Sequence, residues 1–136
     1  MIESAHAILA NLEPSEEMGF ALSFSKLWGI HLNDQNGLKF DEDKTFGSVN
    51  LGRAFSQVYI LDKYGYGNDG EYVGLDIKVL RTQPRDVSMK HLSNSKRIFE
   101  MLVQKVRSCN ESYMEELRQV RDYEELSFYI TSLLMK

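Results

Sequence analysis

Short apolar runs alternate with amphipathic stretches through the first half of the chain. The runs Leu27 to Leu32 and Tyr72 to Ile77 have the length of buried strands, and Met1-Ile2 has the character of the end of an earlier strand. Longer segments with apolar residues at helical spacing separate these runs. Alternation of strands and helices is typical of an α/β protein with a parallel sheet, and this is the fold class that we predict.

Two helices are expected between the three strands. Ser15 is placed to cap the first helix, with Glu16 and Glu17 favourable in its first turn. Asn50 is placed to cap the second helix, which should end near Gly65. The predicted inner faces consist of Met18, Ala21, Leu22 and Ser25 in the first helix and Leu51, Ala54, Phe55, Val58 and Leu61 in the second.

The chain is expected to be helical after Pro84. A shorter helix should lie around Met114, and Asp122 with Glu125 forms a capping-box pattern for the last helix. We therefore divide the chain into residues 1–87, which carry the strand–helix units, and residues 88–136, a C-terminal helical extension. The first and longest helix of this extension should bury a face made of Leu92, Ser95, Phe99, Leu102, Val103 and Val106.

Size, charge and cysteine content narrow the classes of protein that fit. With 136 residues, 43% hydrophobic and 26% charged, the chain can form one globular domain. Its net charge of −4, with scattered basic residues, does not indicate nucleic-acid binding. No apolar run approaches the ~20 residues of a membrane span, and the N-terminus lacks the basic region of a secretory signal. The single Cys109 excludes an internal disulfide and suits the cytosol. From these features together we expect a cytoplasmic protein without membrane or nucleic-acid partners.

Six residues of the types that bind metals lie at or just beyond the ends of the apolar runs. The carboxyl ends of parallel strands meet on one face of a sheet, so these side chains are expected to converge. Together they would carry about four negative charges, which are costly at a dry site unless divalent cations neutralise them. The six residues are Glu3, His6, His31, Asp41, Asp43 and Asp76.

Each of these residues also has an ordinary structural explanation. Glu3 and His6 could form the polar start of a helix, and the segment 41–43 could be part of a solvated loop. His31, inside an apolar run, could be a core histidine with satisfied hydrogen bonds. Asp76 is harder to explain in this way, because a carboxylate within an apolar strand needs a partner. From the residues alone, the metal site and the structural interpretation both stay open.

Three further patterns do not indicate a functional site. Residues 65–70 match G-x-G-x-x-G but follow a helix and lead into a strand, the reverse of the dinucleotide-binding order, so we interpret them as a turn. Residues 34–37 resemble a calcium-binding loop, but the first ligand position of such a loop would be Leu32. His91 has no companion ligands and is interpreted as structural. The polar segment 33–49, in contrast, is longer than a normal connection, and such loops are usually functional.

Four motifs in order resemble the xylose isomerase-like TIM barrels. The first is the E-x-x-H box that begins at Glu3, and the second is the strand K-L-W-G-I-H-L-N-D-Q at residues 26–35. The third is the loop F-D-E-D with a following F-G at residues 40–47, and the fourth is D-I-K-x-x-R-T at residues 76–82. The resemblance implies the C-terminal part of a (β/α)₈ TIM barrel, with about three parallel strands and flanking helices, followed by a helical tail.

The resemblance also implies the roles of individual residues. Glu3 would bridge two divalent ions, and His6, Asp41 and Asp43 would hold the ion whose bound water assists proton movement. These last three residues and Lys78 are the expected catalytic residues. The family interconverts aldoses and ketoses by a hydride shift assisted by Mn²⁺, Co²⁺ or Mg²⁺ ions, which polarise the carbonyl and the adjacent hydroxyl. Mixed carboxylate and imidazole ligands suit Mn²⁺ or Co²⁺ somewhat better than Mg²⁺.

Two departures from the family pattern shape the expected function. His31 and Asp76 would complete the second, structural ion site, but His31 stands where typical xylose isomerases have Asp and looks more like the rhamnose isomerase branch. The family's N-terminal strands, with a further metal carboxylate, a lysine and a His-Asp pair, have no counterpart here. We therefore expect the C-terminal portion of a metal-dependent aldose–ketose isomerase of monosaccharides, whose activity needs the missing barrel half or self-association. The alternative is an incomplete fragment or remnant domain that binds metal or self-associates without activity.

Overall fold

The strands form one open parallel sheet. In the computed structural model, which describes residues 1–136, the sheet consists, in this order, of β1 (Ile2–Glu3), β2 (Gly29–Leu32) and β3 (Tyr72–Leu75). Glu3 pairs with His31, and His31 pairs with Gly74, so these three residues form one row across the sheet. The predicted α/β class is confirmed, and a parallel sheet of this kind is consistent with part of a barrel.

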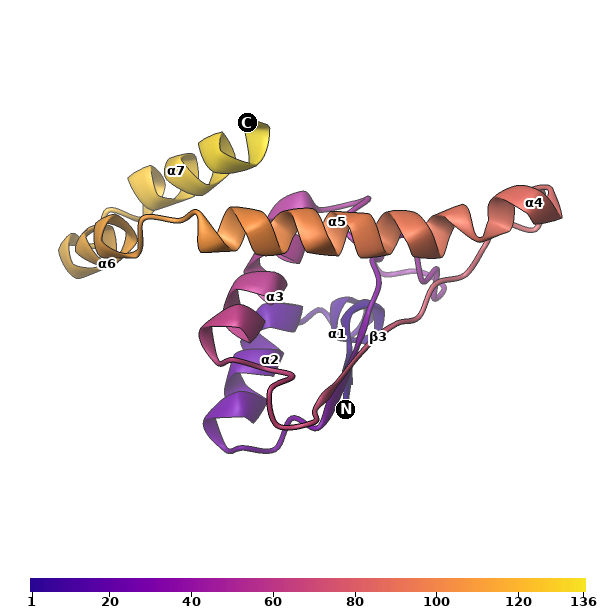
Figure 1. The fold of residues 1–136 in the computed structure, drawn as a ribbon, viewed down its shortest axis with the longest axis horizontal. Helices are drawn as coiled ribbons and strands as arrows, with labels where there is room; N and C mark the ends of the chain where they lie inside the picture. Colours follow the sequence, from indigo (N-terminus) through magenta and orange to yellow (C-terminus); the bar gives the residue numbers. More distant parts are fainter.

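Helices flank the sheet and extend well beyond it (Figure 1). α2 packs against α3, and α5 lies across α3 and contacts β3. α6 lies beyond the carboxyl end of α5, α7 turns back from it and contacts α3, and α4 lies at the opposite end of α5. The helices are α1 (Ser4–Leu9), α2 (Pro14–Ser23), α3 (Leu51–Lys63), α4 (Arg85–Ser88), α5 (Lys90–Arg107), α6 (Glu111–Val120) and α7 (Tyr123–Met135).

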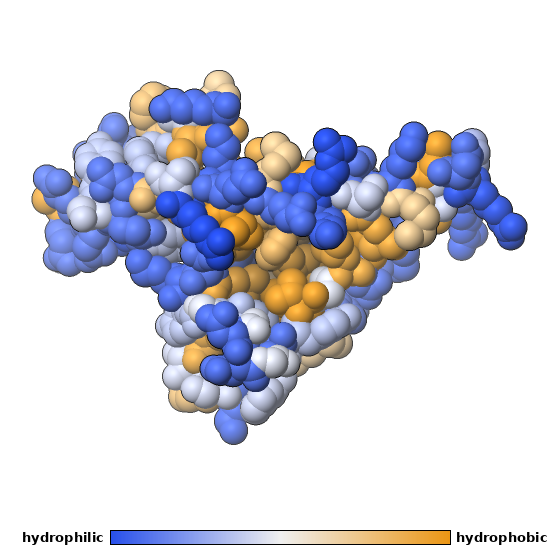
Figure 2. Space-filling model, in the orientation of Figure 1, coloured by the Kyte–Doolittle hydropathy of each residue, from blue (hydrophilic) through white to orange (hydrophobic).

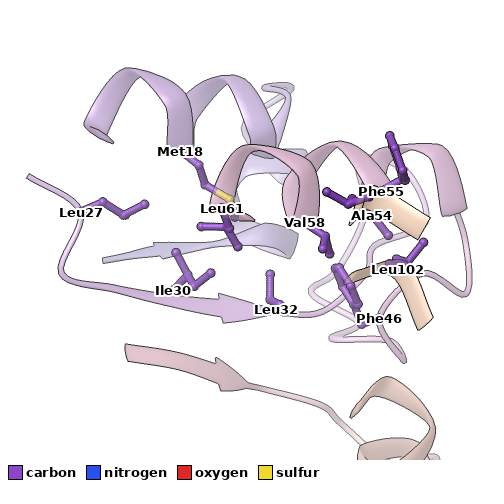
Figure 3. Close-up of a cluster of buried hydrophobic side chains, with 11 residues drawn as sticks. Met18, Leu27, Ile30, Leu32, Phe46, Ala54, Phe55, Val58, Leu61 and Leu102 are labelled. Carbon is purple, nitrogen blue, oxygen red and sulfur yellow. The ribbon is translucent and has the colours of Figure 1, made fainter. Parts of the chain in front are cut away.

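One cluster of buried apolar side chains joins the sheet, the helices and the long loop (Figure 3). Ile30 and Leu32 point from β2 toward the helices, so His31 between them faces the opposite side of the sheet. Phe46 joins the cluster from the loop, and Leu102 and Val106 join it from α5. Burying each large side chain contributes about 1.5–3 kcal/mol. The cluster comprises Met18, Leu27, Ile30, Leu32, Phe46, Ala54, Phe55, Val58, Leu61, Leu102 and Val106.

Two of the three predicted helix caps are confirmed. At the start of α3, the Asn50 Oδ1 atom accepts a hydrogen bond from the backbone N–H of Arg53 at 2.9 Å. At the start of α7, the Asp122 Oδ1 atom accepts one from the backbone N–H of Glu125 at 3.0 Å. Each bond satisfies an N–H group that has no partner within the helix, and this is why short polar side chains favour these positions.

The predicted start and inner face of α2 are partly wrong. The helix begins at Pro14, one residue before Ser15, and Glu13 is the N-cap residue. Proline fits the first helical position because its missing N–H would have no partner there. The helix ends at Ser23, so Ser25 is exposed outside it, with φ of 54°, instead of lying on the inner face.

The third strand is shorter than the apolar run that predicted it. β3 ends at Leu75, and the side chain of Asp76 is 49% exposed just beyond it. The sequence interpretation that placed Asp76 inside an apolar strand is therefore wrong. Residues 65–70 form a turn between α3 and β3, as expected, and the Glu71 carboxylate accepts hydrogen bonds from two backbone N–H groups of this turn at 3.0 Å each.

Apolar side chains are also exposed on one face of the molecule. Figure 2 shows them in the angle between α5 and the sheet-bearing part of the chain. None of the helices combines the length and the apolar character that crossing a membrane requires. The groove in this region is lined on its apolar side by Val58, Leu61, Tyr66, Val73, Phe99 and Val103.

Candidate metal centre

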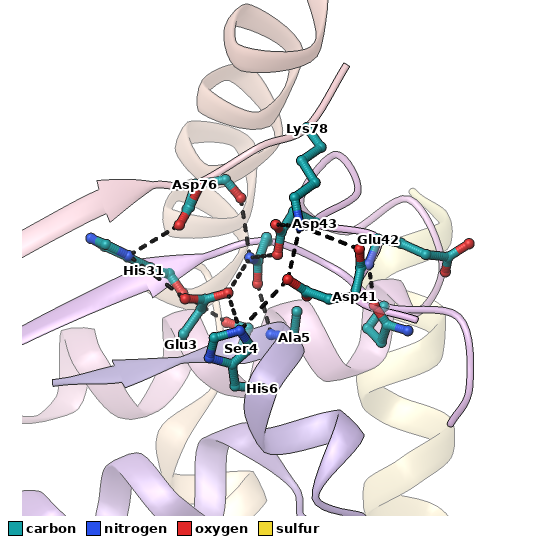
Figure 4. Close-up of polar contacts among 12 residues, drawn as sticks. Glu3, Ser4, Ala5, His6, His31, Asp41, Glu42, Asp43, Asp76 and Lys78 are labelled. Atoms are coloured by element: carbon teal, nitrogen blue, oxygen red, sulfur yellow. Dashed lines mark hydrogen bonds and ion pairs between the residues drawn. The ribbon is translucent and has the colours of Figure 1, made fainter. Parts of the chain in front are cut away.

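The structure places all six predicted ligand residues at the carboxyl edge of the sheet (Figure 4). Glu3 ends β1, His31 lies beside it in β2, and Asp76 follows β3. His6 reaches the same place from the first turns of α1, because α1 begins directly after β1. The loop after β2 supplies the two remaining residues, Asp41 and Asp43.

A first group of ligand atoms comes from Glu3, His31 and Asp76. The His31 Nδ1 atom lies 3.4 Å from Asp76 Oδ2 and 3.9 Å from Glu3 Oε2. This nitrogen is buried and makes no hydrogen bond, although two carboxylate oxygens face it. Tyr72 packs edge-on against the His31 ring, with the ring centroids 5.8 Å apart, and this contact limits the ring's freedom to turn.

A second group comes from Glu3, His6 and Asp41. The His6 Nε2 atom lies 3.3 Å from Glu3 Oε1 and 3.7 Å from Asp41 Oδ2. The other oxygen of Asp41, Oδ1, is buried and has no hydrogen-bond partner. The two groups share Glu3, and the ligand atoms within each lie no more than 4.8 Å from one another.

Asp43 and Lys78 belong to neither group of three. The Lys78 Nζ atom lies 2.7 Å from Asp43 Oδ2 and 2.8 Å from Asp41 Oδ2, so its ammonium group bridges the two aspartates. The Asp43 side chain is only 5% exposed, and it sits in a left-handed backbone conformation with φ of 42°. The structure therefore gives Asp43 a lysine partner in the place where the family resemblance implied a metal ion.

Sequence reasoning gave no role to Asn33, which lies at the centre of the site. Its Oδ1 atom accepts a hydrogen bond from the backbone N–H of Ala5 at 2.7 Å. Its Nδ2 atom donates to Glu3 Oε1 at 3.2 Å, to Asp43 Oδ1 at 2.9 Å and to the carbonyl of Asp76 at 3.1 Å. Asn33 thus ties α1, all three strand ends and the loop together. Its place directly after the apolar run that ends at Leu32 was the one signal in the sequence that could have indicated it.

Two neighbouring residues shape the loop that carries the aspartates. Asp34 accepts hydrogen bonds from the backbone N–H groups of Gln35, Val49 and Asn50 at 2.9 to 3.1 Å, so its carboxylate is occupied by the chain itself. The Gln35 side chain donates to the carbonyls at residues 37 and 40 and accepts from the N–H of Glu42. These buried side chains fix the path of the loop and thereby the position of Asp41.

His91 lies away from both groups, on α5. Its Nδ1 atom is 3.0 Å from the Thr45 hydroxyl, and its Nε2 atom is 2.6 Å from Gln83 Oε1. With both ring nitrogens engaged by uncharged side chains, His91 connects the loop to the segment before α5.

The carboxylates of the site perturb one another. Burial raises the pKa of Glu3, and the nearby carboxylates of Asp43 and Asp76 raise it further. The hydrogen bond from Lys78 lowers the pKa of Asp41. Hydrogen bonds to Asp41 and Asp43 raise the pKa of Lys78 well above its usual range, so it stays an ammonium ion at neutral pH.

The donor set fits a divalent transition-metal ion. Neighbouring ligands of an octahedral ion with bonds of about 2.1 Å lie about 3 Å apart. The ion-pair separations within the two groups are 3.3 to 3.9 Å, so small side-chain movements would bring the atoms into coordinating positions. Carboxylate oxygen with imidazole nitrogen is a combination suited to Mn²⁺ or Co²⁺. The His31 Nδ1 and Asp41 Oδ1 atoms have no hydrogen-bond partner, and such ions would bind atoms of this kind.

Comparison with known proteins gives a view independent of this geometry. No family model matches the chain. Proteins named xylose isomerase are similar to it over 84 residues: the one from Thermus thermophilus is 38% identical, that from Thermus caldophilus 37% and that from Streptomyces lividans 36%. The match covers 62% of this chain but 20–21% of those proteins, so the chain spans about a fifth of the length of the curated relatives it matches. Over these 84 residues the chain is therefore similar to xylose isomerases, in agreement with the resemblance that the motifs carry.

Proposed function

We propose that this chain is the metal-binding part of a divalent-metal-dependent aldose–ketose isomerase that acts on a monosaccharide. The observation that carries the proposal is the pair of ligand groups that share Glu3 at the carboxyl edge of a parallel sheet, the edge where barrel enzymes hold their active sites. The similarity to proteins named xylose isomerase supports the reaction class. We propose two ions, with Mn²⁺ or Co²⁺ preferred to Mg²⁺.

Different residues of the site would bind the ions, hold the ligands in place and contact the substrate. Glu3 offers Oε1 toward His6 and Oε2 toward His31, so one carboxylate can serve both ions. Bound ions would supply Lewis acidity toward the carbonyl and hydroxyl oxygens of a sugar. Asn33 holds Glu3 by a hydrogen bond at 3.2 Å, and the buried Asp43 holds Lys78, whose ammonium group could contact a substrate oxygen at the same edge.

A melting experiment with metal tests this proposal. Millimolar Mn²⁺ should raise the melting temperature of the chain, because an ion that binds only the folded state stabilises it by mass action. Glu3→Gln should abolish the shift, since Glu3 belongs to both groups. Glu42→Gln is the matched control: the Glu3 and Glu42 side chains are 12% and 13% exposed, but Glu42 belongs to neither group. No shift in the wild-type chain, or equal shifts in the two variants, would refute the proposed site.

A second candidate function is metal binding or self-association without catalysis. The observation that favours it is the open sheet, in which β1 and β3 each pair on one side only. A sheet of this kind builds one sector of a binding site and leaves the opposite wall to other chains or segments. Isomerase activity that appears when a second chain supplies the opposite wall of the site would favour the first function, whereas metal binding without activity in that complex would favour the second.

A further inference from the structure

Lys78 occupies a position between the loop aspartates that a metal ion would also favour (Figure 4). Its Nζ atom lies 2.8 Å from Asp41 Oδ2, 3.3 Å from the Asp41 carbonyl and 2.7 Å from Asp43 Oδ2. The same Asp41 Oδ2 atom lies 3.7 Å from His6 Nε2 in the second ligand group. One carboxylate oxygen therefore faces both an internal cation and the proposed position of an ion.

From this arrangement we infer that Lys78 is a built-in competitor for the divalent ion held by Glu3, His6 and Asp41. In the metal-free chain its ammonium group pairs with both Asp41 and Asp43 and offsets one of their two negative charges. A divalent ion in the second group would stand a few ångströms from this ammonium group, and like charges at such distances repel. Full binding of the ion therefore requires Lys78 to release Asp41. This inference rests on the proposed metal site.

The structure gives Lys78 a second partner that it can keep when it releases Asp41. Asp43 is almost fully buried, and Asn33 holds its other oxygen by a hydrogen bond at 2.9 Å. The Lys78 side chain is about half exposed, so its ammonium group has room to move away from Asp41 while it stays with Asp43. The competition should be confined to the second group, because the ion pairs of Lys78 involve no residue of the group formed by Glu3, His31 and Asp76.

Removal of the Lys78 charge should have two effects of opposite sign. The Kd for Mn²⁺ should fall at least about tenfold, because the ion no longer competes with an ammonium group for Asp41. The melting temperature of the metal-free chain should fall at the same time, because the buried Asp43 loses its counter-ion. A lysine that only stabilised the fold would lower the melting temperature without improving metal affinity.

Two substitutions and one control make the test sharp. Lys78→Met removes both the charge and the hydrogen bonds, whereas Lys78→Gln removes the charge but keeps a donor for Asp43 and is the variant expected to fold best. Lys39→Met is the matched control, because Lys39 is a half-exposed lysine of the loop that carries Asp41 and Asp43. It pairs with Glu42 at 3.4 Å, outside both ligand groups. The control therefore changes the net charge by the same amount without touching Asp41.

The experiment is isothermal titration calorimetry of Mn²⁺ into each full-length variant at constant ionic strength, together with melting curves of the metal-free proteins. The expected result is tighter binding by Lys78→Gln and Lys78→Met and wild-type affinity in Lys39→Met. Binding by the Lys78 variants that is no tighter than that of Lys39→Met would overturn the competition and leave the metal site standing. If neither the wild-type chain nor any variant binds Mn²⁺, the competition and the proposed function are both refuted.

Discussion

Asn33 is the buried amide around which the ligand carboxylates are arranged. An amide nitrogen has two N–H groups, yet the Nδ2 atom of Asn33 faces three acceptors within 3.2 Å. At least one of its N–H groups is therefore shared between two acceptors. Its Oδ1 atom accepts the backbone N–H at the start of α1. The side chain thus holds the carboxylates of Glu3 and Asp43 close together before any ion binds. Preorganisation of this kind is what the ligands of a metal site need from the residues behind them.

Substitution of Asn33 by alanine should destabilise the chain by about 2–3 kcal/mol, because several buried polar groups lose their partner at once. Urea unfolding measures this change, with Asn36→Ala as the control, since Asn36 is exposed on the same loop. The Mn²⁺-induced rise in melting temperature should also shrink in Asn33→Ala. Equal unfolding free energies for the two variants would show that the amide does not organise the site.

The sequence identified ligand types more readily than the residues that support them. Glu3, His6, Asp41 and Asp76 stand out because side chains of metal-binding types follow successive apolar runs, and the carboxyl ends of parallel strands meet on one face of a sheet. Asn33 does not stand out in the sequence, because its role in holding the site together depends on hydrogen bonds to four residues elsewhere in the chain. The pairing of Asp43 with a lysine rather than with a shared metal position depends in the same way on tertiary structure.

For the helices and strands, the spacing of apolar residues predicted the elements that depend on local burial. It missed element ends that depend on particular neighbouring residues. The long helix α5 and the capped helix α3 follow directly from their apolar spacing and from Asn50. The start of α2 was misplaced because Ser15 is a good cap by type, whereas the fixed φ of Pro14 already suits the first helical position. Asp76 was assigned to a strand interior because the apolar run continues past the last residue that pairs with β2.

The contact between α3 and α6 gives a pH-dependent prediction. Glu111 accepts hydrogen bonds from Lys63 and from the Tyr59 hydroxyl at 2.9 Å each, and Lys63 is the larger cause of the lowered pKa of Glu111. A carboxyl group with a lowered pKa in the folded state stabilises the protein above its unfolded pKa, and this stabilisation is lost as the pH falls through the folded pKa. The pair is largely exposed and screened by solvent, so we expect its contribution to stability to be small.

Free energies of unfolding measured between pH 3 and pH 7 check this expectation. Glu111→Gln should reduce stability near neutral pH and should flatten the loss of stability below about pH 4. Glu16→Gln serves as the control, because Glu16 is exposed and forms no ion pair. A pH dependence for Glu111→Gln identical to that of the wild type would contradict this account of the contact.

At the scale of the whole molecule, the open sheet predicts self-association. The outer edge of β3 has no strand partner, and Val73 on this strand is partly exposed beside an apolar groove. Unpaired strand edges and exposed apolar surface favour pairing with another chain. Sedimentation at micromolar concentration should therefore show species larger than a monomer.

A charge on the edge strand should weaken this association. Val73→Lys places a lysine where a second copy would pair, whereas Val120→Lys places one on the exposed surface of α6. Only the first substitution should shift the sedimentation profile toward monomer. A wild-type chain that sediments as a stable monomer would refute the prediction outright.

The chain by itself should show no appreciable sugar isomerase activity. A hydride shift needs an oriented open-chain sugar and exclusion of water, and a single sector of three strands leaves the site open on one side. Purified chain incubated with Mn²⁺ and aldoses such as xylose and rhamnose should form no more ketose than Glu3→Gln does. Ketose formation above that control would show that self-association rebuilds a complete site.

We propose that Glu3 stands between two ions at the edge of the sheet, and the position of bound Mn²⁺ tests this arrangement. Crystals grown with Mn²⁺ give an anomalous difference map at the manganese absorption edge. We expect one peak among Glu3, His31 and Asp76 and a second among Glu3, His6 and Asp41. A map without a peak beside Glu3, from crystals that bind Mn²⁺ elsewhere or not at all, would contradict it.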